Sequence, residues 1–251
     1  MKKTFTINEA PYSIRCLLYG GGEGAFDRVI LFAHGFGGHK ENGAARRFAD
    51  YMLSKHKRAA VVCFDWPCHG EDVRKKLKLD DCDAYLRLVT EYAREKLLAK
   101  DLYMYATSFG GYLTLKYIAD HGSPFKKVAL RCPAVNMADV LDKSIMTDEN
   151  RAMLSKGKEA SVGFDRKIRV SADFMKELRE ADIVKRSFLD WAEDMLILHG
   201  TKDEIVPFDT VSAFADDNCI EFVPIRNADH RFMDPGKMTE AILRIEEFFA
   251  L

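Results

Sequence analysis

Ser108 stands where a short apolar strand is expected to run straight into a helix, because residues 102–112 read LYMYATSFGGY. Two small residues, Ala106 and Gly110, flank it at the spacing of the strand-to-helix turn that exposes a nucleophile. Such a turn strains the backbone of its central residue, so its neighbours must have little or no side chain. The spacing alone is common among proteins, but the strand before it and the helix after it predict that Ser108 is a nucleophile.

A serine hydroxyl is a weak nucleophile near neutral pH and needs a base within hydrogen-bond reach. His230 lies in the segment NADHRF, after the last expected strand and before the last expected helix, so we predict that it is this base. The other histidines are not expected to be the base. His34 and His199 are expected in turns at strand ends, and His69 at a corner between a strand and a loop. His39 and His56 are expected on the surface, and His121 at the end of a helix.

The base needs an acid that orients the imidazole and stabilises its charged form. Asp203 follows an expected strand in the sequence LILHGTKDEIVP, in a loop that should lie above the sheet. Glu204 is expected to point into solvent, and Asp229 is adjacent to His230 and therefore badly placed to reach its ring nitrogen. The order serine, acid, histidine along the chain is the one used by α/β-hydrolases.

Negative charge on a reacting carbonyl oxygen needs two hydrogen-bond donors. The amide of Phe109, which follows the nucleophile, is one candidate. The other is the amide of Phe36 in the loop HGFGG at residues 34–38. This loop lacks the lysine and spacing of a P-loop, and no GxGxxG with a following acidic residue is present, so we expect no nucleotide site. We expect neither a cofactor nor a metal.

Short apolar runs alternate with segments of helical spacing along most of the chain, which predicts parallel crossovers and a mostly parallel central sheet with helices on both faces. We expect two edge strands first, at Lys3–Ile7 and Tyr12–Tyr19. The further expected strands are Val29–Ala33, Ala59–Phe64, Leu102–Ala106, Lys127–Arg131, Met195–His199 and Ile220–Ile225, and the expected helices are Gly43–Lys55, Tyr85–Lys100, Phe109–His121, Pro207–Asp216 and Lys237–Phe249.

The alternation stops at about residues 134–192, a charged stretch without a long apolar strand. A connection of this length usually carries structure of its own or a function, so we expect an inserted cap, helical or built on a hairpin, over the site. Its apolar side chains either line a substrate pocket or, as we favour, pack the cap onto the sheet; they are Met137, Met146, Met153, Phe164, Phe174, Met175 and Trp191.

Composition fits a globular protein with a buried core: of 251 residues, 47% are hydrophobic and 31% charged. We expect residues 1–251 to form one domain, because the strand–helix pattern runs through nearly the whole chain. The net charge of −1 provides no basic surface for nucleic acid. No run approaches the ~18 apolar residues that a membrane span needs.

The six cysteines form no CxxC pair and resemble neither a zinc site nor a disulfide framework. Cys63, Cys132 and Cys219 sit in apolar runs and are expected to be buried. The first residues are basic but lack the apolar stretch of a signal peptide. These features together predict a cytoplasmic, reduced protein.

These motifs resemble those of the α/β-hydrolase serine esterases and lipases. Residues 34–38 resemble the oxyanion loop of that family, and residues 65–70 resemble its D-x-x-G-H-G segment. Residues 106–110 resemble the nucleophile elbow, residues 199–207 the acid loop H-G-x-x-D-x-x-V-P, and residues 228–230 the segment that carries the base. The resemblance spans roughly residues 29–251 apart from the cap. The phenylalanine after the first HG, together with the cap, is closest to cinnamoyl (feruloyl) esterases and monoacylglycerol-lipase-like enzymes.

Two residues depart from the family pattern. Ala106 replaces the first glycine of the elbow and is small enough to keep the turn. Cys68 replaces the glycine before His69, which concerns a structural turn and not the chemistry.

The resemblance implies hydrolysis of a carboxylic ester through an acyl-enzyme, with small to medium or aromatic acyl groups, and a small-molecule ester as the partner. A thioesterase, an amidase or peptidase, or a carbon–carbon bond hydrolase would use the same fold, and a non-catalytic ligand receptor could retain it. Oligomeric state stays open, with a homodimer possible.

Overall fold

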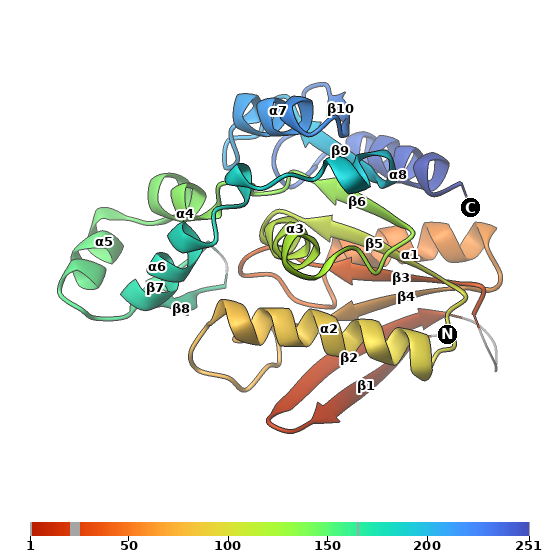
Figure 1. The fold of residues 1–251 in the computed structure, drawn as a ribbon, viewed down its shortest axis with the longest axis horizontal. Coiled ribbons are helices and arrows are strands. Elements are labelled where there is room, and N and C mark those ends of the chain that lie inside the picture. The colour runs from red at the N-terminus through yellow and green to blue at the C-terminus, as the bar shows by residue number, and fades with distance from the viewer. Residues whose placement is uncertain (1, 21–25, 165, 251) are drawn as a thin grey trace.

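The computed structural model describes residues 2–20, 26–164 and 166–250. Its centre is an eight-stranded sheet in the order β1-β2-β4-β3-β5-β6-β9-β10 (Figure 1). The β1–β2 and β2–β4 pairs are antiparallel, and the pairs from β4 to β10 are all parallel. The strands are β1 (Lys2–Glu9), β2 (Tyr12–Gly20), β3 (Arg28–Ala33), β4 (Ala59–Phe64), β5 (Asp101–Thr107), β6 (Lys127–Arg131), β9 (Met195–Gly200) and β10 (Glu221–Ile225).

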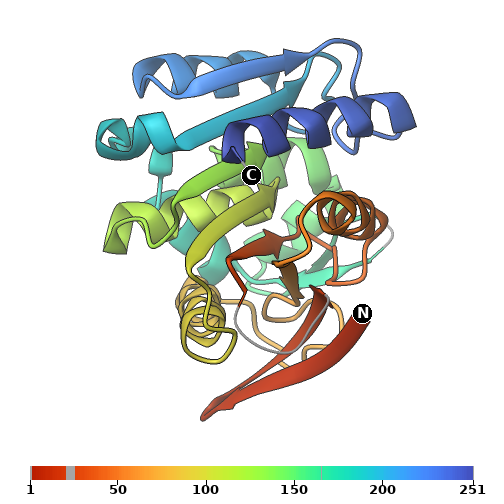
Figure 2. The ribbon, with the colours of Figure 1, turned by 90° about the vertical axis from the view of Figure 1, so that its right-hand side faces the viewer.

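The predicted fold class, an α/β fold with a mostly parallel sheet covered on both faces, is confirmed. The β1–β2 hairpin lies at one end of the sheet and β9–β10 at the other (Figure 2). One detail of the prediction is wrong: β2 is not an edge strand, because it lies between β1 and β4. Its backbone is therefore paired on both sides, whereas β1 forms the edge.

Alternation along the inner strands produces two apolar layers. In β3, Val29 and Leu31 contribute to one layer, while Ile30 and Phe32 contribute to the other. Helices α2 (Leu79–Glu95), α3 (Phe109–His121) and α7 (Phe208–Asp217) cover the first face, and α1 (Gly43–Lys55) and α8 (Pro235–Phe249) cover the second. Because both faces are covered, nearly every residue of β3, β4, β5, β6 and β9 is buried, as their continuous apolar sequences predict.

Most boundaries agree with the prediction within two residues, but α2 begins six residues earlier than the expected Tyr85 and ends five before Lys100. Its first turn is polar in sequence, yet Leu79 and Cys82 are buried there. Two aspartates in that turn favour a helix N-terminus through the helix dipole. The early start is therefore set by packing that periodicity alone did not reveal.

Between β6 and β9 the chain forms a small group of elements at the carboxyl ends of the parallel strands (Figure 1). They are α4 (Met137–Asp139), the π-helical turn η1 (Val140–Ile145), α5 (Asp148–Ser155), the antiparallel hairpin of β7 (Ala160–Val162) and β8 (Ile168–Val170), and α6 (Ala172–Glu180). The 3₁₀ turns η2 (Ile183–Lys185) and η3 (Leu189–Asp194) then lead to the amino end of β9. Helices and a hairpin thus both occur in the segment predicted to be a cap.

Most of the apolar side chains of this segment pack inward, in agreement with the interpretation that we favoured. Met137, Met146, Phe174 and Met175 are buried, and Trp191 is partly buried. Met153 is 39% exposed, and Phe164 at the tip of the β7–β8 hairpin is 51% exposed. Elsewhere, Cys63 and Cys132 are buried as expected, but Cys219 is exposed, because it follows the end of α7 in a left-handed conformation. No helix in the described part of the chain has the length and apolarity to cross a bilayer.

Candidate active site

Ser108 occupies the turn between β5 and α3 with φ 51° and ψ −116°, a conformation that L-residues rarely adopt. Its amide donates to the carbonyl of Arg131 at 3.0 Å, and its carbonyl accepts from the amide of Ala134 at 3.2 Å. A Cβ at Gly110 would lie 2.5 Å from the carbonyl oxygen of Ala33. The small residue two positions after the serine is therefore required by the close approach of α3 to β3.

The structure brings Ser108, His230 and Asp203 together in one hydrogen-bonded chain. The Nε2 of His230 lies 3.0 Å from Oγ of Ser108, and its Nδ1 lies 2.7 Å from Oδ2 of Asp203. These distances permit the imidazole to accept the serine proton while the carboxylate holds the opposite ring nitrogen. The three side chains are separated by 122 and 27 positions in the sequence.

The side chain of Asp203 is fully buried and well supplied with donors. Its Oδ1 accepts from the amides of Ile205 at 2.9 Å and Val206 at 2.8 Å, and its Oδ2 faces His230. Burial by itself raises the pKa of this carboxyl, but the hydrogen bonds and the nearby imidazoles outweigh it and the pKa is lowered. Glu204 is exposed, as expected, and accepts a long hydrogen bond from the His230 amide.

The acid loop and the base loop are joined by backbone contacts. The amide of Lys202 donates to the carbonyl of Ala228 at 3.0 Å, and that of Thr201 donates to Ile225 at 3.1 Å. A Cβ at Gly200 would lie 2.4 Å from the Ala228 carbonyl oxygen. The glycine thus permits the close contact that places the carboxylate opposite the imidazole.

The loop at 34–38 passes directly beside the serine. A Cβ at Gly35 would meet the Cβ of Ser108 at 3.2 Å, so the following amide, that of Phe36, lies next to the site. The rings of Phe36 and Phe109 pack edge to face at 5.6 Å. Phe109 opens α3, where a backbone amide has no partner within the helix. Both residues whose amides are predicted donors therefore lie in the neighbourhood of the serine.

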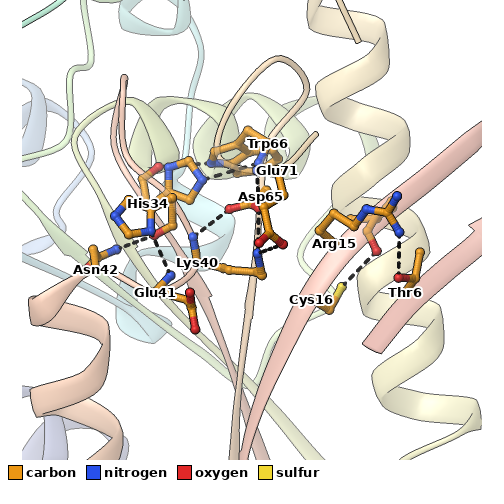
Figure 3. A network of polar contacts seen from close by, with 12 residues as sticks. Thr6, Arg15, Cys16, His34, Lys40, Glu41, Asn42, Asp65, Trp66 and Glu71 are labelled. Carbon is orange, nitrogen blue, oxygen red and sulfur yellow. Dashed lines mark hydrogen bonds and ion pairs between the residues drawn. The ribbon is translucent and has the colours of Figure 1, made fainter. Parts of the chain in front are cut away.

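An ionic network, which the sequence analysis missed, follows this loop and joins the buried side chains of Lys40 and Asp65 to the exposed side chain of Glu71 (Figure 3). Lys40 Nζ lies 3.0 Å from Oδ2 of Asp65 and 2.5 Å from Oε2 of Glu71. The Asp65 carboxylate also accepts from the amides of Lys40 at 2.7 Å and Glu71 at 2.9 Å. A Cβ at Gly70 would lie 2.2 Å from this carboxyl group, which explains the glycine there.

Two further histidines support the loop. His34 is buried, its Nδ1 lies 2.8 Å from the carbonyl of Gly35, and its Nε2 accepts from the amide of Trp66 (Figure 3). His69 packs against Phe36 and Phe109, and burial lowers its pKa to about 4. Both therefore serve as neutral structural groups. Cys68 has φ 65°, the conformation that explains why the family places glycine at this position.

The other histidines differ in part from their sequence interpretations. His39 and His56 are partly buried rather than exposed, and Nε2 of His56 contacts Glu246 at 3.1 Å. His199 is not a turn residue: it is buried within β9, with Nε2 3.0 Å from the Val206 carbonyl and 3.3 Å from Oδ2 of Asp203. It thereby adds a second imidazole beside the acid.

Cys132, Asp203 and His230 offer donor atoms within 4.8 Å of one another, the spacing of a metal site. However, the His230 nitrogen that faces this group is already 2.7 Å from the carboxylate. Burial, followed by the charge of Asp203, holds the pKa of the Cys132 thiol well above its ordinary value. A neutral thiol is a poor metal ligand, so this cluster fits a support for the acid better than a metal centre.

A cavity of about 460 Å³ opens in front of Ser108 and His230. The 34–38 loop, the start of α1, Phe164 and Arg166 from the β7–β8 hairpin, and Arg131 and Arg231 form its walls. The carbonyl of Arg166 lies so close to the 34–38 loop that a Cβ at Gly37 would meet it at 2.9 Å. The hairpin tip therefore reaches the entrance of the site.

The family model described as the alpha/beta hydrolase fold matches residues 28–163. The structure is similar to the ferulic acid-bound structure of Est1E from Butyrivibrio proteoclasticus, with TM-score 0.74 and 20% identity over 98% of this chain and 100% of that chain. It is also similar to a putative hydrolase from Agrobacterium vitis S4, with TM-score 0.77 and 16% identity over 99% and 98% of the two chains.

Alpha/beta hydrolase domain-containing protein 10 from mouse gives TM-score 0.70 and 16% identity over 99% of this chain and 98% of that chain. A search of curated protein sequences found no match. The family model covers more than half of the chain and the fold is shared over the full length of these structures. The chain belongs to the alpha/beta hydrolase fold family.

Proposed function

We propose that this protein is a serine hydrolase that cleaves carboxylic esters, with Ser108 as nucleophile, His230 as base and Asp203 as the orienting acid. The observation that carries the proposal is the unbroken hydrogen-bonded chain from Ser108 Oγ through the imidazole to the buried carboxylate. A hydroxyl, a base and an acid in this geometry form the arrangement that makes serine reactive toward acyl carbons.

In the proposed reaction, His230 takes the hydroxyl proton while Ser108 Oγ forms a bond to the ester carbonyl carbon. The amides of Phe36 and Phe109 donate to the resulting oxyanion. The alkoxy oxygen leaves with the proton held by His230, which yields an alcohol and an acyl-enzyme. Water then attacks the acyl carbon by the same route and releases the carboxylic acid. Residues 134–192 act in this proposal as a cap whose hairpin tip narrows the entrance.

The first experiment is labelling with a fluorophosphonate, which phosphonylates an activated serine. We expect one modified residue, Ser108, and no labelling of Ser108→Ala. Asp203→Asn should remain folded and lose about 10⁴ in turnover, because the imidazole would be held in the wrong tautomer. Labelling at another serine, or full activity of Ser108→Ala, would contradict the proposal. A folded protein that is not labelled would instead favour a ligand receptor.

The second experiment defines the leaving group and the acyl group. A panel of p-nitrophenyl esters of increasing chain length, with methyl ferulate, a thioester and an anilide, separates ester hydrolysis from thioesterase and amidase activity. Methyl ferulate is included because ferulic acid is bound in the similar structure of Est1E. We expect the esters to be cleaved faster than the anilide.

A further inference from the structure

The cavity in front of Ser108 carries positive charge on several sides. Arg131, Arg166 and Arg231 line it, and no aspartate or glutamate is found among its described lining residues. The nearest carboxylate of the site, that of Asp203, is fully buried and lies 2.7 Å from the His230 imidazole. Its charge is thus engaged behind the imidazole and does not form part of the cavity wall.

Arg131 is the most unusual of these arginines, because it is only 7% exposed. Its Nη1 donates to the carbonyl of His230 at 3.3 Å, and its guanidinium lies over the ring of Phe232 at 5.0 Å. Its Nε has no hydrogen-bond partner, and no carboxylate pairs with it among the described residues. A buried guanidinium normally has an anionic partner, since desolvation of an uncompensated charge is costly.

Arg166 approaches the same cavity from the opposite side, on the tip of the β7–β8 hairpin. Its side chain is exposed, and its backbone rests against Gly37 of the oxyanion loop. Burial, and after it the charge of Arg166, lowers the pKa of His39, another residue of the cavity wall. The field of this arginine therefore extends into the cavity.

We infer that the substrate is an ester that carries a carboxylate, which Arg131 and Arg166 bind while the ester carbonyl lies at Ser108. A guanidinium presents paired N–H donors that match the two oxygens of a carboxylate. The bound carboxylate supplies the anion that Arg131 lacks within the chain. This inference rests on the proposed function and adds the charge of the substrate to it.

The test compares pairs of esters that differ only in charge. For the alcohol portion, the pair is 4-acetoxybenzoate and 4-acetoxybenzamide; for the acyl portion, it is monomethyl adipate and the methyl ester of adipamic acid. In at least one pair, the anionic member should have the higher kcat/KM, by about 10-fold to 100-fold, as expected for a charged hydrogen bond. The pair that responds identifies which portion carries the charge.

Variants of the two arginines then connect the preference to the site. Arg131→Met and Arg166→Gln should each reduce the ratio of anionic to neutral kcat/KM by about tenfold, and Arg131→Lys should retain part of it. The ratio is the readout because a mere displacement of His230 would slow both members equally. Arg244→Gln is the control, since Arg244 is exposed on α8 and pairs with Glu247 at 3.3 Å.

Binding to Ser108→Ala, measured by calorimetry with the same esters, tests the inference independently of catalysis. Tighter binding of the anionic member, lost in the Arg166→Gln background, supports the carboxylate site even if Ser108 proves not to be the nucleophile. Equal binding and equal kcat/KM within both pairs would overturn the inference. The proposed function would survive that result if the fluorophosphonate still labels Ser108.

Discussion

The buried pair of Lys40 and Asp65 provides the most direct test of how the 34–38 loop, the proposed oxyanion loop, is held. Their side chains are 4% and 0% exposed, and their charged atoms are 3.0 Å apart. Lys40→Met keeps the length of the side chain and removes the charge. The Asp65 carboxylate would then remain buried with only the two amide donors, those of Lys40 and Glu71, at 2.7 Å and 2.9 Å.

Removing one partner of a buried ion pair costs about 3–5 kcal/mol of unfolding free energy, because the other charge is left uncompensated. The two amide donors place the expected loss at the lower end, about 3 kcal/mol. For a chain of this size, each kcal/mol lowers Tm by about 2–4 °C, so Lys40→Met should melt about 6–12 °C below the wild type. Because Lys40 follows the proposed oxyanion loop, kcat should fall more than KM rises.

The matched control is Lys2→Met, which removes an exposed ion pair with Glu41, the neighbour of Lys40, at 2.7 Å. An exposed pair contributes about 0–1 kcal/mol, so Tm should hardly change. Thermal unfolding of both variants by calorimetry, with ester turnover in parallel, measures the contrast. If Lys40→Met melts within a degree or two of Lys2→Met, the account of the buried pair is wrong.

Three further predictions concern the same region. The pKa of His69 in the folded state is about 4, below the value of roughly 6.5 in the unfolded chain. Its contribution to stability is therefore complete above pH ~6.5 and is lost as pH falls toward 4. When the pH is lowered from 7.5 to 5, the unfolding free energy of the wild type, measured by urea denaturation, should fall by about 2 kcal/mol more than that of His69→Asn. Equal losses in the two proteins would refute the low pKa of His69. Gly110→Ala should lower the unfolding free energy by about 2 kcal/mol or more, because its Cβ would meet two backbone oxygens within 2.7 Å. The control is Gly43→Ala, whose Cβ would meet nothing within 4 Å. Thermal unfolding by calorimetry should show that Gly110→Ala is destabilised and that Gly43→Ala is not. Ser108→Gly should raise the unfolding free energy by about 1 kcal/mol through relief of the strained φ, and it should abolish fluorophosphonate labelling; unchanged or lower stability would contradict the strain.

Features encoded locally could be predicted from the sequence. The inner strands follow from apolar runs with glycine and polar residues between them, and the helix boundaries of α1 and α3 agree with their spacing. The turn at Ser108 follows from a strand, two small neighbours and a helix within eleven residues. In each case, the physical requirement acts within one element or between adjacent elements, so the residues that satisfy it are close together in the sequence.

The start of α2 and the exposure of Cys219 could not be predicted in this way. Residues 79–84 look polar, and Leu79 and Cys82 become a buried helical turn only because the core covers them. Cys219 follows an apolar helix in sequence but points away from the core, because the chain turns there with a positive φ.

The sequence by itself determined the succession of the main strands and helices along the chain, the strained serine turn and the candidates for base and acid. These features depend on local periodicity and on the chemistry of single side chains. Only the tertiary structure decided which distant groups surround them. The ion pair of Lys40 with Asp65 joins residues 25 positions apart, and Arg131 reaches the carbonyl of His230 across 99 positions. Such contacts arise when parallel strands bring their carboxyl ends to the same edge of the sheet, and no local pattern encodes which side chains will meet there.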